Sequence, residues 1–520
     1  MHKFLLTSLL ILILLGIGAY SYFYGSNWLD SDHSSEMVLG RLLAEENTFI
    51  STNWYYSTEL RTVYQTIFTM PLFKFLGHMD NWALIRSINI VLNNFLLILS
   101  YFFLMGKTGI KYKWIVLSGI FLILPLTYEY WNIVTFGGYY VFFMAQLFFV
   151  LGLLNRLVQH EEINKKNILL FIFFILFSLL LGVQSVRSLL VIFFPLLTAG
   201  IYIKVKTGRQ KCFPFFLGTL GFISAVMGFI SNNFLHNYFS FFSAESISLD
   251  NYANYLQKFG FSIMNIAGFF GLESRLPVLS LQGILSIAAI IGTFFFLKGA
   301  LKTADEESLK SRMNFIPVFF AAALAFNVFV FVISDYIILL KYFFPFMVLY
   351  VPLSAMFFTY AEKNYTRLKR IILTAGIIIF IFGQSFFTFQ FLHKRDINSN
   401  RNGHIQYLLD NELYFGFATF WNANIATELS SGKIDIAGIE NTGRGAGQNP
   451  FSVMHWLIPS AYTEPEYHTG ETFLLLSQGE WDQLRGRGVF SGTTPNYSDE
   501  HFIVIRYPSA EIVFREILGY

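Results

Sequence analysis

The sequence predicts an α-helical polytopic membrane protein with about 11 transmembrane helices, two juxtamembrane helices in the first outer loop and a small α+β extracytoplasmic C-terminal domain. Hydrophobic residues make up 54% of the 520 residues and charged residues only 13%, about half the share in soluble domains. Long apolar runs recur up to Leu392, after which the composition becomes mixed and polar. We therefore expect residues 1–392 in the membrane and residues 393–520 outside it.

Eleven apolar runs of about 17 to 23 residues are long enough to cross the hydrocarbon core of a bilayer. They begin near Phe4, Ala83, Trp114, Gly138, Ile168, Ser188, Phe213, Val278, Phe315, Tyr336 and Ile371. The first run is long for a signal peptide and lacks a clear small-residue cleavage site, so we expect a permanent span. The runs near Ile168 and Ser188 could instead form a hairpin that does not fully cross, which would leave the orientation of the other spans unchanged.

The positions of lysine and arginine predict the orientation of these spans. Basic connections alternate strictly with connections that are nearly free of Lys and Arg; the basic ones are residues 107–113, 165–166, 204–211, 298–314 and 361–370. Basic loops stay on the cytoplasmic side of a membrane. We therefore expect the N-terminus in the cytoplasm, and residues 25–82, residues 236–277 and the C-terminal domain outside.

The first outer loop begins with SDHSSEMVLGRLLAEEN, residues 31–47, which has the pattern of an amphipathic helix capped by Ser31 or Asp32. Its apolar stripe consists of Val38, Leu39, Leu42 and Leu43, and we expect this stripe to lie in the membrane interface. Arg41 and Glu45 fall on the opposite side, toward water. Asp32 and Glu36 fall within about 40° of each other, at the border of the stripe and at the depth of the lipid headgroups.

A second juxtamembrane helix is predicted for STELRTVYQTIFTMPLFKFLG, residues 57–77, with an apolar face before Pro71. Glu59 and Arg61 stand in its first turn. Between the two helices, Tyr55 and Tyr56 follow Trp54 in an aromatic stretch that suits the membrane–water interface. Both predicted helices of this loop therefore begin with acidic residues on the outer face.

Further charged residues stand at the outer ends of the predicted spans, namely Glu129, Arg187, Glu273, Arg275, Asp335 and Lys341. Ionisable groups near the membrane are costly, so each suggests a function. Cations at such positions could bind a phosphate, and carboxylates could bind a metal or accept a proton. The structural alternatives are helix capping by Asp32, solvation of Glu36, extension of Lys341 to the headgroups and an Asp335–Lys341 pair.

Several classes of function lack a sequence signal. The net charge of +3 does not suggest nucleic acid as a partner, and the single cysteine, Cys212, cannot form an intramolecular disulfide. The motifs of P-loop, dinucleotide-binding, zinc-protease and serine-hydrolase sites are missing from the sequence. Chemistry that depends on a bound nucleotide therefore has no support.

Residues after Leu392 have the pattern of a folded domain. Gly, Asn, Glu and Thr become more frequent, and the apolar runs shorten to strand length, as in TFLLLSQ and HFIVIRYP. The segment NTGRGAGQNP has the composition of a loop. The aromatic and polar stretch FATFWNANI could stack on sugars, although an ordinary small core uses the same residues. We expect an α+β domain of about 120 residues.

With these elements placed, the chain resembles the glycosyltransferase C superfamily, polytopic enzymes that use polyprenyl-phosphate-linked sugars and include protein O-mannosyltransferases and the lipid A aminoarabinose transferase. The resemblance lies in the acidic first outer loop, the many spans, the outer domain and KYFFP at residues 341–345, which is similar to an Arg-Tyr-x-x-Pro pattern. SSEMVLGRLLAEEN and NWYYSTELR are further similar to bacterial membrane proteins of this type. The first-loop carboxylate of the superfamily maps onto Asp32, with Glu36 one turn on and Asp30 nearby.

The resemblance, together with the charged residues at the outer face, suggests a role for each of these residues. Asp32 and Glu36 would be catalytic and could hold a divalent cation, Mg²⁺ or Mn²⁺. Lys341, Tyr342, Arg187, Arg61 and Arg275 would contact the donor phosphate, with Lys341 acting as a point charge in place of a bidentate Arg. Glu59, Glu129, Tyr55 and Tyr56 would contact substrate.

The expected function is therefore a hexosyltransferase-like glycosyltransferase, multi-pass in the bacterial plasma membrane. It would transfer a sugar from a polyprenyl-phosphate donor to an outer acceptor such as a cell-surface polysaccharide or teichoic acid, with the lipid bilayer as its other partner. The alternatives are a lipid-linked sugar flippase or polysaccharide exporter, a polysaccharide polymerase or ligase, and a receptor without enzymatic activity. A flippase is expected to show an internal repeat and charges along a path through the membrane, and the sequence shows neither.

Overall fold

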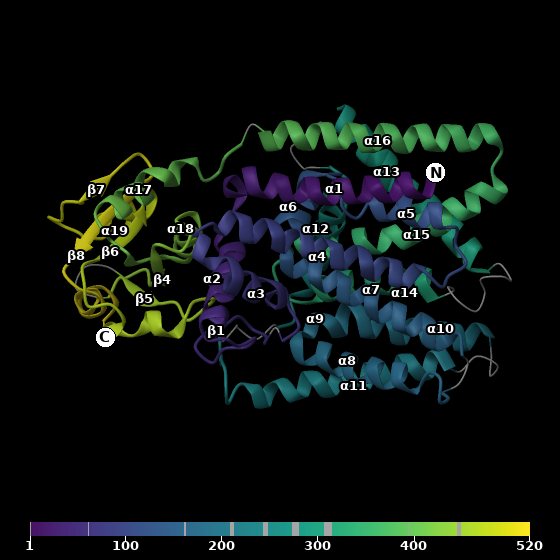
Figure 1. The fold of residues 1–520 in the computed structure, drawn as a ribbon, viewed down its shortest axis with the longest axis horizontal. Helices are drawn as coiled ribbons and strands as arrows, with labels where there is room; N and C mark the ends of the chain where they lie inside the picture. Colours follow the sequence, from purple (N-terminus) through teal and green to yellow (C-terminus); the bar gives the residue numbers. More distant parts are fainter. Residues whose placement is uncertain are drawn as a thin grey trace.

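The computed structural model describes residues 2–60, 62–160, 163–207, 213–242, 248–272, 280–305, 315–393, 395–444 and 449–519. Long helices run side by side through the larger part of the molecule, and a smaller part with a β-sheet lies at one end of them (Figure 1). The N-terminus lies at the opposite end of the helices. Arg61, Cys212, Glu273, Arg275 and the predicted span start at Val278 lie outside the described residues.

Within the described residues, nine helical segments are long and apolar enough to cross a membrane. They are Phe4–Trp28, Trp82–Met105, Gly138–Val158, Val186–Lys206, Phe213–Leu235, Leu281–Ala304, Phe315–Ile333, Leu340–Asn364 and Arg367–Leu392. The prediction of a multi-pass helical membrane protein is thereby confirmed. The corresponding helices are α1 (His2–Tyr24), α4 (Trp82–Met105), α7 (Gly138–Val158), α10 (Phe194–Thr207), α11 (Phe213–Leu235), α13 (Leu281–Asp305), α14 (Phe315–Ile333), α15 (Phe344–Asn364) and α16 (Arg367–His393).

Two of the eleven predicted spans have a different form. The run near Ile168 forms α8 (Ile168–Gln184), an apolar helix of 17 residues that packs along α11. The run near Trp114 forms two helices of nine residues each, α5 (Tyr112–Ile120) and α6 (Tyr128–Phe136). Pro125 lies between them and has no N–H to donate, and Thr127 begins α6 by accepting a hydrogen bond from the Tyr130 N–H. One continuous helix was therefore the wrong prediction for this segment.

Two of the predicted basic connections lie at the same end of the bundle. Glu362, at the end of α15, accepts hydrogen bonds from Lys111 Nζ at 3.0 Å and from Lys113 Nζ at 2.7 Å. Trp114 Nε1 donates to the same carboxylate at 2.6 Å. The two α-helices of the first outer loop and the sheet lie at the other end (Figure 1).

The first outer loop contains α2 (Ser31–Glu45) and α3 (Thr66–Leu76). The N-cap of α2 is Asp30, whose side chain accepts from the His33 N–H, and not Ser31 or Asp32 as predicted. The second helix begins nine residues later than predicted and continues through Pro71. The two helices pack closely, because a Cβ at Gly40 would lie 2.9 Å from the Thr69 Cβ.

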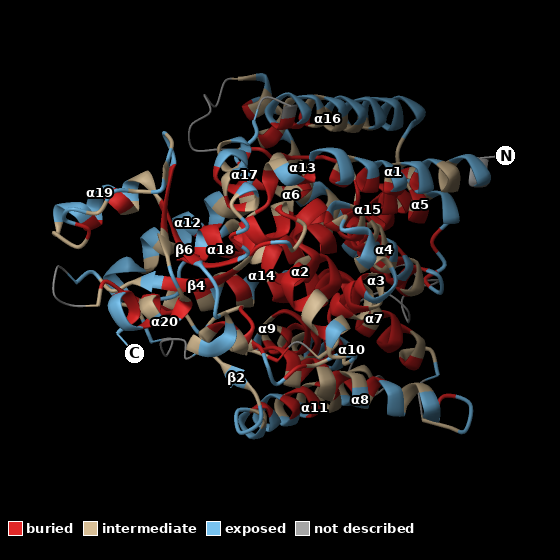
Figure 2. Cartoon of the chain, turned by 60° about the vertical axis from the view of Figure 1, so that its left-hand side comes forward, coloured by how far each residue is buried: buried red, intermediate tan, exposed pale blue. Residues whose placement is uncertain are grey.

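The prediction that α2 lies on the membrane surface was wrong. Its apolar residues Val38, Leu39 and Leu43 are buried, and α2 packs against α3 on one side and against α18 (Phe420–Leu429) of the C-terminal part on the other. Figure 2 shows α2 near the middle of the molecule and buried along most of its length. An amphipathic stripe buries equally well against protein or against lipid, so the pattern alone could not distinguish the two.

The C-terminal part contains a six-stranded mixed sheet in the order β5-β4-β3-β6-β8-β7. Its strands are β3 (Phe415–Thr419), β4 (Asp435–Asn441), β5 (Phe451–Val453), β6 (Thr472–Ser477), β7 (Tyr497–Ser498) and β8 (Phe502–Tyr507), and its helices are α17 (Asn402–Asp410), α18, α19 (Gln478–Gly486) and α20 (Ala510–Val513). The strands β4 and β6 run parallel to β3. The predicted small sheet region at the C-terminus is confirmed, with TFLLLSQ and HFIVIRYP forming β6 and β8.

Two shorter segments complete the loops at this end of the bundle. β1 (Tyr55–Tyr56) of the first outer loop pairs in parallel with β2 (Ser240–Phe241) of the long outer loop. The long loop also contains α12 (Tyr255–Gly268), which packs beside α14. Tyr55 further exchanges backbone hydrogen bonds with residues 457 and 458 of the C-terminal part. Backbone hydrogen bonds therefore join the first outer loop to the long outer loop and to the C-terminal part.

Candidate functional site

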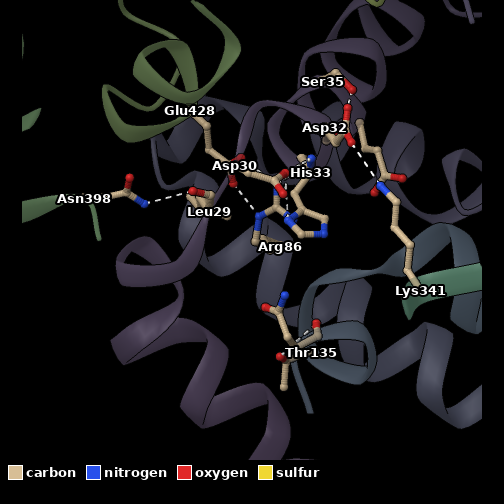
Figure 3. A network of polar contacts seen from close by, with 12 residues as sticks. Leu29, Asp30, Asp32, His33, Ser35, Arg86, Thr135, Lys341, Asn398 and Glu428 are labelled. Carbon is tan, nitrogen blue, oxygen red and sulfur yellow. Dashed lines mark hydrogen bonds and ion pairs between the residues drawn. The ribbon is translucent and has the colours of Figure 1, made fainter. Parts of the chain in front are cut away.

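The structure brings together two predicted site residues from distant parts of the chain, Asp32 and Lys341. Asp32 stands in the first turn of α2, and Lys341 stands in the short 3-10 helix Leu340–Phe343 that leads into α15. Lys341 Nζ lies 3.5 Å from Asp32 Oδ2 (Figure 3). The side chains are 39% and 32% exposed, respectively, so both can be reached from outside the protein. Asp335 bonds instead to the N–H and hydroxyl of Ser248, so the alternative Asp335–Lys341 pair is not formed.

Glu36 has a different environment from Asp32, although it lies only one helical turn further along α2. It is 8% exposed and accepts hydrogen bonds from the Tyr64 hydroxyl and from Gln65 Nε2. Gln65 Oε1 in turn accepts from Asn89 and Asn93 of α4, each at 3.1 Å. The expectation that Glu36 lies at headgroup depth beside Asp32 was therefore wrong, because this carboxylate points into a buried polar network.

Next to Asp32, the start of α2 carries a second charged cluster (Figure 3). His33 Nδ1 lies 3.0 Å from Asp30 Oδ1. Burial opposes the charged form of His33, but the adjacent Asp30 outweighs it and raises the pKa of His33 above its ordinary value. Burial also opposes the Asp30 carboxylate, and the charge and hydrogen bonds of His33 outweigh it and lower the pKa of Asp30. Each of the two side chains therefore favours the charged form of the other.

This pair of side chains predicts a dependence of stability on pH. A histidine with a raised folded-state pKa stabilises the fold fully below its unfolded pKa of about 6.5, and this contribution is lost as the pH rises through the folded-state pKa. We expect the unfolding temperature of wild type to fall over this range, and the His33→Gln variant to show a flatter profile. Thermal unfolding in detergent between pH 6 and 9 measures this difference, with the exposed His501→Gln as the control. Equal slopes for His33→Gln and wild type would contradict it.

Arg187 lies in an aromatic cluster that includes Tyr342, the residue that follows Lys341 in the chain. Its guanidinium group lies over the rings of Tyr139, Tyr140 and Tyr342, at 5.1, 5.2 and 5.2 Å from their centroids. Nη1 of Arg187 is buried and has no hydrogen-bond partner among the described residues. Tyr342 directly follows Lys341 in the chain, so this aromatic cluster joins Arg187 to the segment that carries Lys341.

The remaining predicted site residues have other partners. Glu59 Oε1 accepts from the Ser185 hydroxyl at 2.9 Å and from the Val186 N–H at 3.1 Å, next to Arg187. The Tyr55 ring packs on His455 of the C-terminal part, whereas the Tyr56 hydroxyl donates to the Ser51 carbonyl inside the loop. Glu129 stands half-buried in the first turn of α6.

A divalent cation held by Asp32 and Glu36 finds little support in these contacts. Within the described ranges, no three His, Cys, Asp or Glu side chains are close enough together to hold a metal ion. The Glu36 carboxylate already accepts from Tyr64 and Gln65, and donors of this kind would have to move before a cation could bind there. Asp32 and Glu36, as they lie among the described residues, do not by themselves fit a metal site.

Sequence reasoning missed a buried ion pair that supports the site. Arg86 of α4 is bound by Glu428 of α18 through two hydrogen bonds, one of them 2.5 Å between Nη2 and Oε2. Arg86 Nη2 also donates to the His33 carbonyl at 2.9 Å. A signal was present, because Arg86, Asn89 and Asn93 follow the spacing of one helical face within a predicted span, where polar groups are costly.

An apolar cavity of about 280 Å³ lies among the membrane-spanning helices. Its lining includes Phe121, Tyr130, Phe269, Phe296, Met347 and Phe380. Gly292 of α13 and Gly376 of α16 also line it, and a Cβ at either glycine would meet no atom within 4 Å. Met347 lies six residues after Lys341, which is roughly 10 Å along a helix, so one end of the cavity lies near the charged site.

Comparison with protein-family models gave no match, and comparison with curated proteins gave none either.

Proposed function

We propose that the protein is a membrane glycosyltransferase that takes a sugar from a polyprenyl-phosphate donor and transfers it to an acceptor on the outer side of a bacterial plasma membrane. The contact between Asp32 and Lys341 is the observation that carries this proposal. A carboxylate can accept a proton from a hydroxyl group, and an ammonium group can bind a phosphate. The helix α2, which carries Asp32, lies at the end of the bundle next to the sheet, and on this proposal that end faces outward.

The proposed reaction is an inverting displacement. The Asp32 carboxylate accepts the proton of an acceptor hydroxyl, and the acceptor oxygen forms a bond to the anomeric carbon of the sugar. The bond between that carbon and the phosphate oxygen breaks, and polyprenyl phosphate leaves with the electron pair. Lys341 and Arg187 stabilise the negative charge on the leaving phosphate, which is more effective where water is scarce. A phosphate leaves without protonation, so no second carboxylate is needed as an acid.

The surroundings of the two carboxylates favour Asp32 as the base. Asp32 is about one-third exposed and bonds to the cation that would hold the donor phosphate. Glu36 is buried, and its oxygens are already bonded to Tyr64 and Gln65. An acceptor hydroxyl must approach within hydrogen-bond distance of its base, and only Asp32 offers that approach without a rearrangement of buried side chains.

The apolar cavity suits the hydrocarbon chain of the donor, and its glycines allow this to be tested. We expect Gly292→Leu and Gly376→Leu to fill the cavity and to raise the KM for a long-chain polyprenyl-phosphate sugar by about 5- to 30-fold, since one to two buried methylenes correspond to about 1–2 kcal/mol. A short-chain donor analogue should be affected much less. Gly16→Leu in α1 is the matched control, because it also has open space at Cβ and lies outside the cavity lining. Equal effects on both donors would contradict this role.

Incubation of the purified protein with a panel of radiolabelled polyprenyl-phosphate sugars and a cell-envelope acceptor fraction tests the proposed function. A glycosyltransferase of this type releases polyprenyl phosphate and labels the acceptor. A flippase moves the intact lipid-linked sugar across a vesicle membrane without breaking the sugar–phosphate bond, a polymerase extends the glycan on its lipid, and a receptor does neither. Failure to release polyprenyl phosphate from any donor of the panel would overturn the proposal.

A further inference from the structure

The first turn of α2 is held in place by a residue of the C-terminal domain that acts through Arg86. Arg86 donates to the His33 carbonyl, 2.9 Å away, and it is bound on its other side by Glu428. The side chains of Arg86 and Glu428 are 5% and 4% exposed, so this ion pair is closed off from solvent. His33 directly follows Asp32, and Figure 3 shows Arg86 between α2 and Glu428. A chain of contacts therefore leads from α18 to the residue next to Asp32.

The third turn of α2 is held by the same domain through a second arginine. Arg41 Nη2 donates to Asp435 Oδ1 at 2.5 Å and to the Tyr462 hydroxyl at 2.9 Å. Arg41 Nη1 donates to the Gly432 carbonyl at 3.0 Å. The prediction that Arg41 faces water was wrong, because its side chain enters the C-terminal domain. The planar guanidinium group fixes direction as well as distance, so the contacts restrain α2 against rotation about its axis.

A further contact fixes the chain just before α2. Asn398, in the segment between α16 and α17, donates from Nδ2 to the carbonyls of Ser26 and Leu29 at 2.7 and 3.0 Å. The Ile397 N–H donates to the Asn27 carbonyl at 3.1 Å. The backbone on either side of Asp32 is thus bound by residues from the C-terminal third of the protein.

We propose that Glu428 and Asp435 are positioning residues, which hold α2 through Arg86 and Arg41 so that Asp32 faces Lys341. This assignment rests on the proposed function for what Asp32 does there. The C-terminal domain then takes part in building the site. Misplacement of a reacting group by about 1 Å can lower a rate on the order of 100-fold, so a helix that is free to rotate would lower the rate of the chemical step more than it would weaken donor binding.

The variant Glu428→Gln tests this proposal, since it keeps the size of the side chain and removes its charge. We expect kcat to fall by about 10- to 100-fold while the donor KM changes by less than about threefold. The matched control is Glu471→Gln, which removes an ion pair with Arg506 within the same domain at a more exposed place. This control should leave kcat within about twofold of wild type, since exposed ion pairs contribute little. A kcat for Glu428→Gln equal to that of the control would overturn the proposal.

Hydrogen–deuterium exchange provides a readout that needs no activity. In Glu428→Gln, amides of residues 31–37 should exchange at least about 10-fold faster than in wild type, while the strands β3, β6 and β8 keep their protection. If no donor is consumed by the wild-type protein, the proposed function fails and this readout still tests the role of Glu428. Unchanged exchange over residues 31–37 would overturn the positioning role whatever the activity.

Two further variants separate positioning from general stability. Arg86→Glu with Glu428→Arg restores a buried ion pair but places an acceptor where Arg86 donates to the His33 carbonyl. We expect this double variant to recover thermal stability without recovering kcat; full recovery of kcat would overturn the proposed path through Arg86.

If Glu428→Gln does not fold, Asp435→Asn takes its place, because Asp435 is 24% exposed and its loss should release the third turn of α2. Wild-type kcat and wild-type exchange over residues 37–45 in Asp435→Asn would overturn the role of Asp435.

Discussion

The variant Asp32→Asn is expected to lose sugar transfer by at least about 100- to 10,000-fold, the range that a general base contributes to an enzymatic rate. Asparagine has the size of aspartate but cannot accept the proton of an acceptor hydroxyl at neutral pH. The fold should be little affected, because the Asp32–Lys341 ion pair is more than one-third exposed on its lysine side and such pairs contribute only about 0–1 kcal/mol. The measurement is the initial rate of polyprenyl phosphate release, with thermal unfolding as the check on folding.

The matched control for this variant is Asp80→Asn in the same outer loop. Asp80 is exposed and adopts a left-handed backbone conformation with a φ of 48°, which asparagine tolerates well. We expect wild-type rates for Asp80→Asn.

We expect Lys341→Ala to raise the donor KM, whereas unchanged donor affinity would remove Lys341 from the phosphate site. Near-normal transfer by Asp32→Asn together with loss of transfer by Glu36→Gln would assign the base to Glu36 instead.

The membrane part of the fold could be predicted because span length and apolarity are local properties of the chain. The runs beginning at Ala83, Gly138 and Phe213 could be identified as spans without knowing which helices pack around them, and each forms one helix. The break within the run near Trp114 was less visible, because apolar residues continue on both sides of Pro125. Hydropathy measures transfer to lipid, whereas the break depends on one missing N–H group and on the cap at Thr127.

The candidate site could be predicted only in part, because its support comes from residues far away in the sequence. Topology alone placed Asp32 and Lys341 in the same compartment, and the structure brings them within 3.5 Å. No sequence signal indicated that Glu428 enters the bundle to bind Arg86, since FWNANIATEL also has the composition of a small core. The stripe of α2 was assigned to lipid for the same reason, because a pattern of buried residues does not identify what covers it.

Arg86→Met is expected to lower the free energy of unfolding by about 3–5 kcal/mol, because it leaves the Glu428 carboxylate buried without its cation. The two side chains are only 4–5% exposed, so water cannot replace the lost partner. The double variant Arg86→Met with Glu428→Met should recover most of this loss, since apolar side chains of similar volume often replace a buried ion pair without a net cost. Denaturant unfolding of the full chain in detergent, followed by tryptophan fluorescence, measures both.

The control for this prediction is Arg506→Met in the C-terminal domain. Arg506 pairs with Glu471, and these side chains are 28% and 53% exposed, so its replacement should cost no more than about 1 kcal/mol. Similar losses for Arg86→Met and Arg506→Met would show that the Glu428 carboxylate finds water or another donor at the domain boundary. A double variant less stable than Arg86→Met alone would show that the residues contribute through packing and not through charge. Arg86 also donates to the His33 carbonyl, and methionine cannot replace this hydrogen bond. The double variant should therefore regain stability, while the amides at the start of α2 remain less protected from exchange than in wild type. This difference separates the contribution of the ion pair to the stability of the fold from its effect on the position of Asp32.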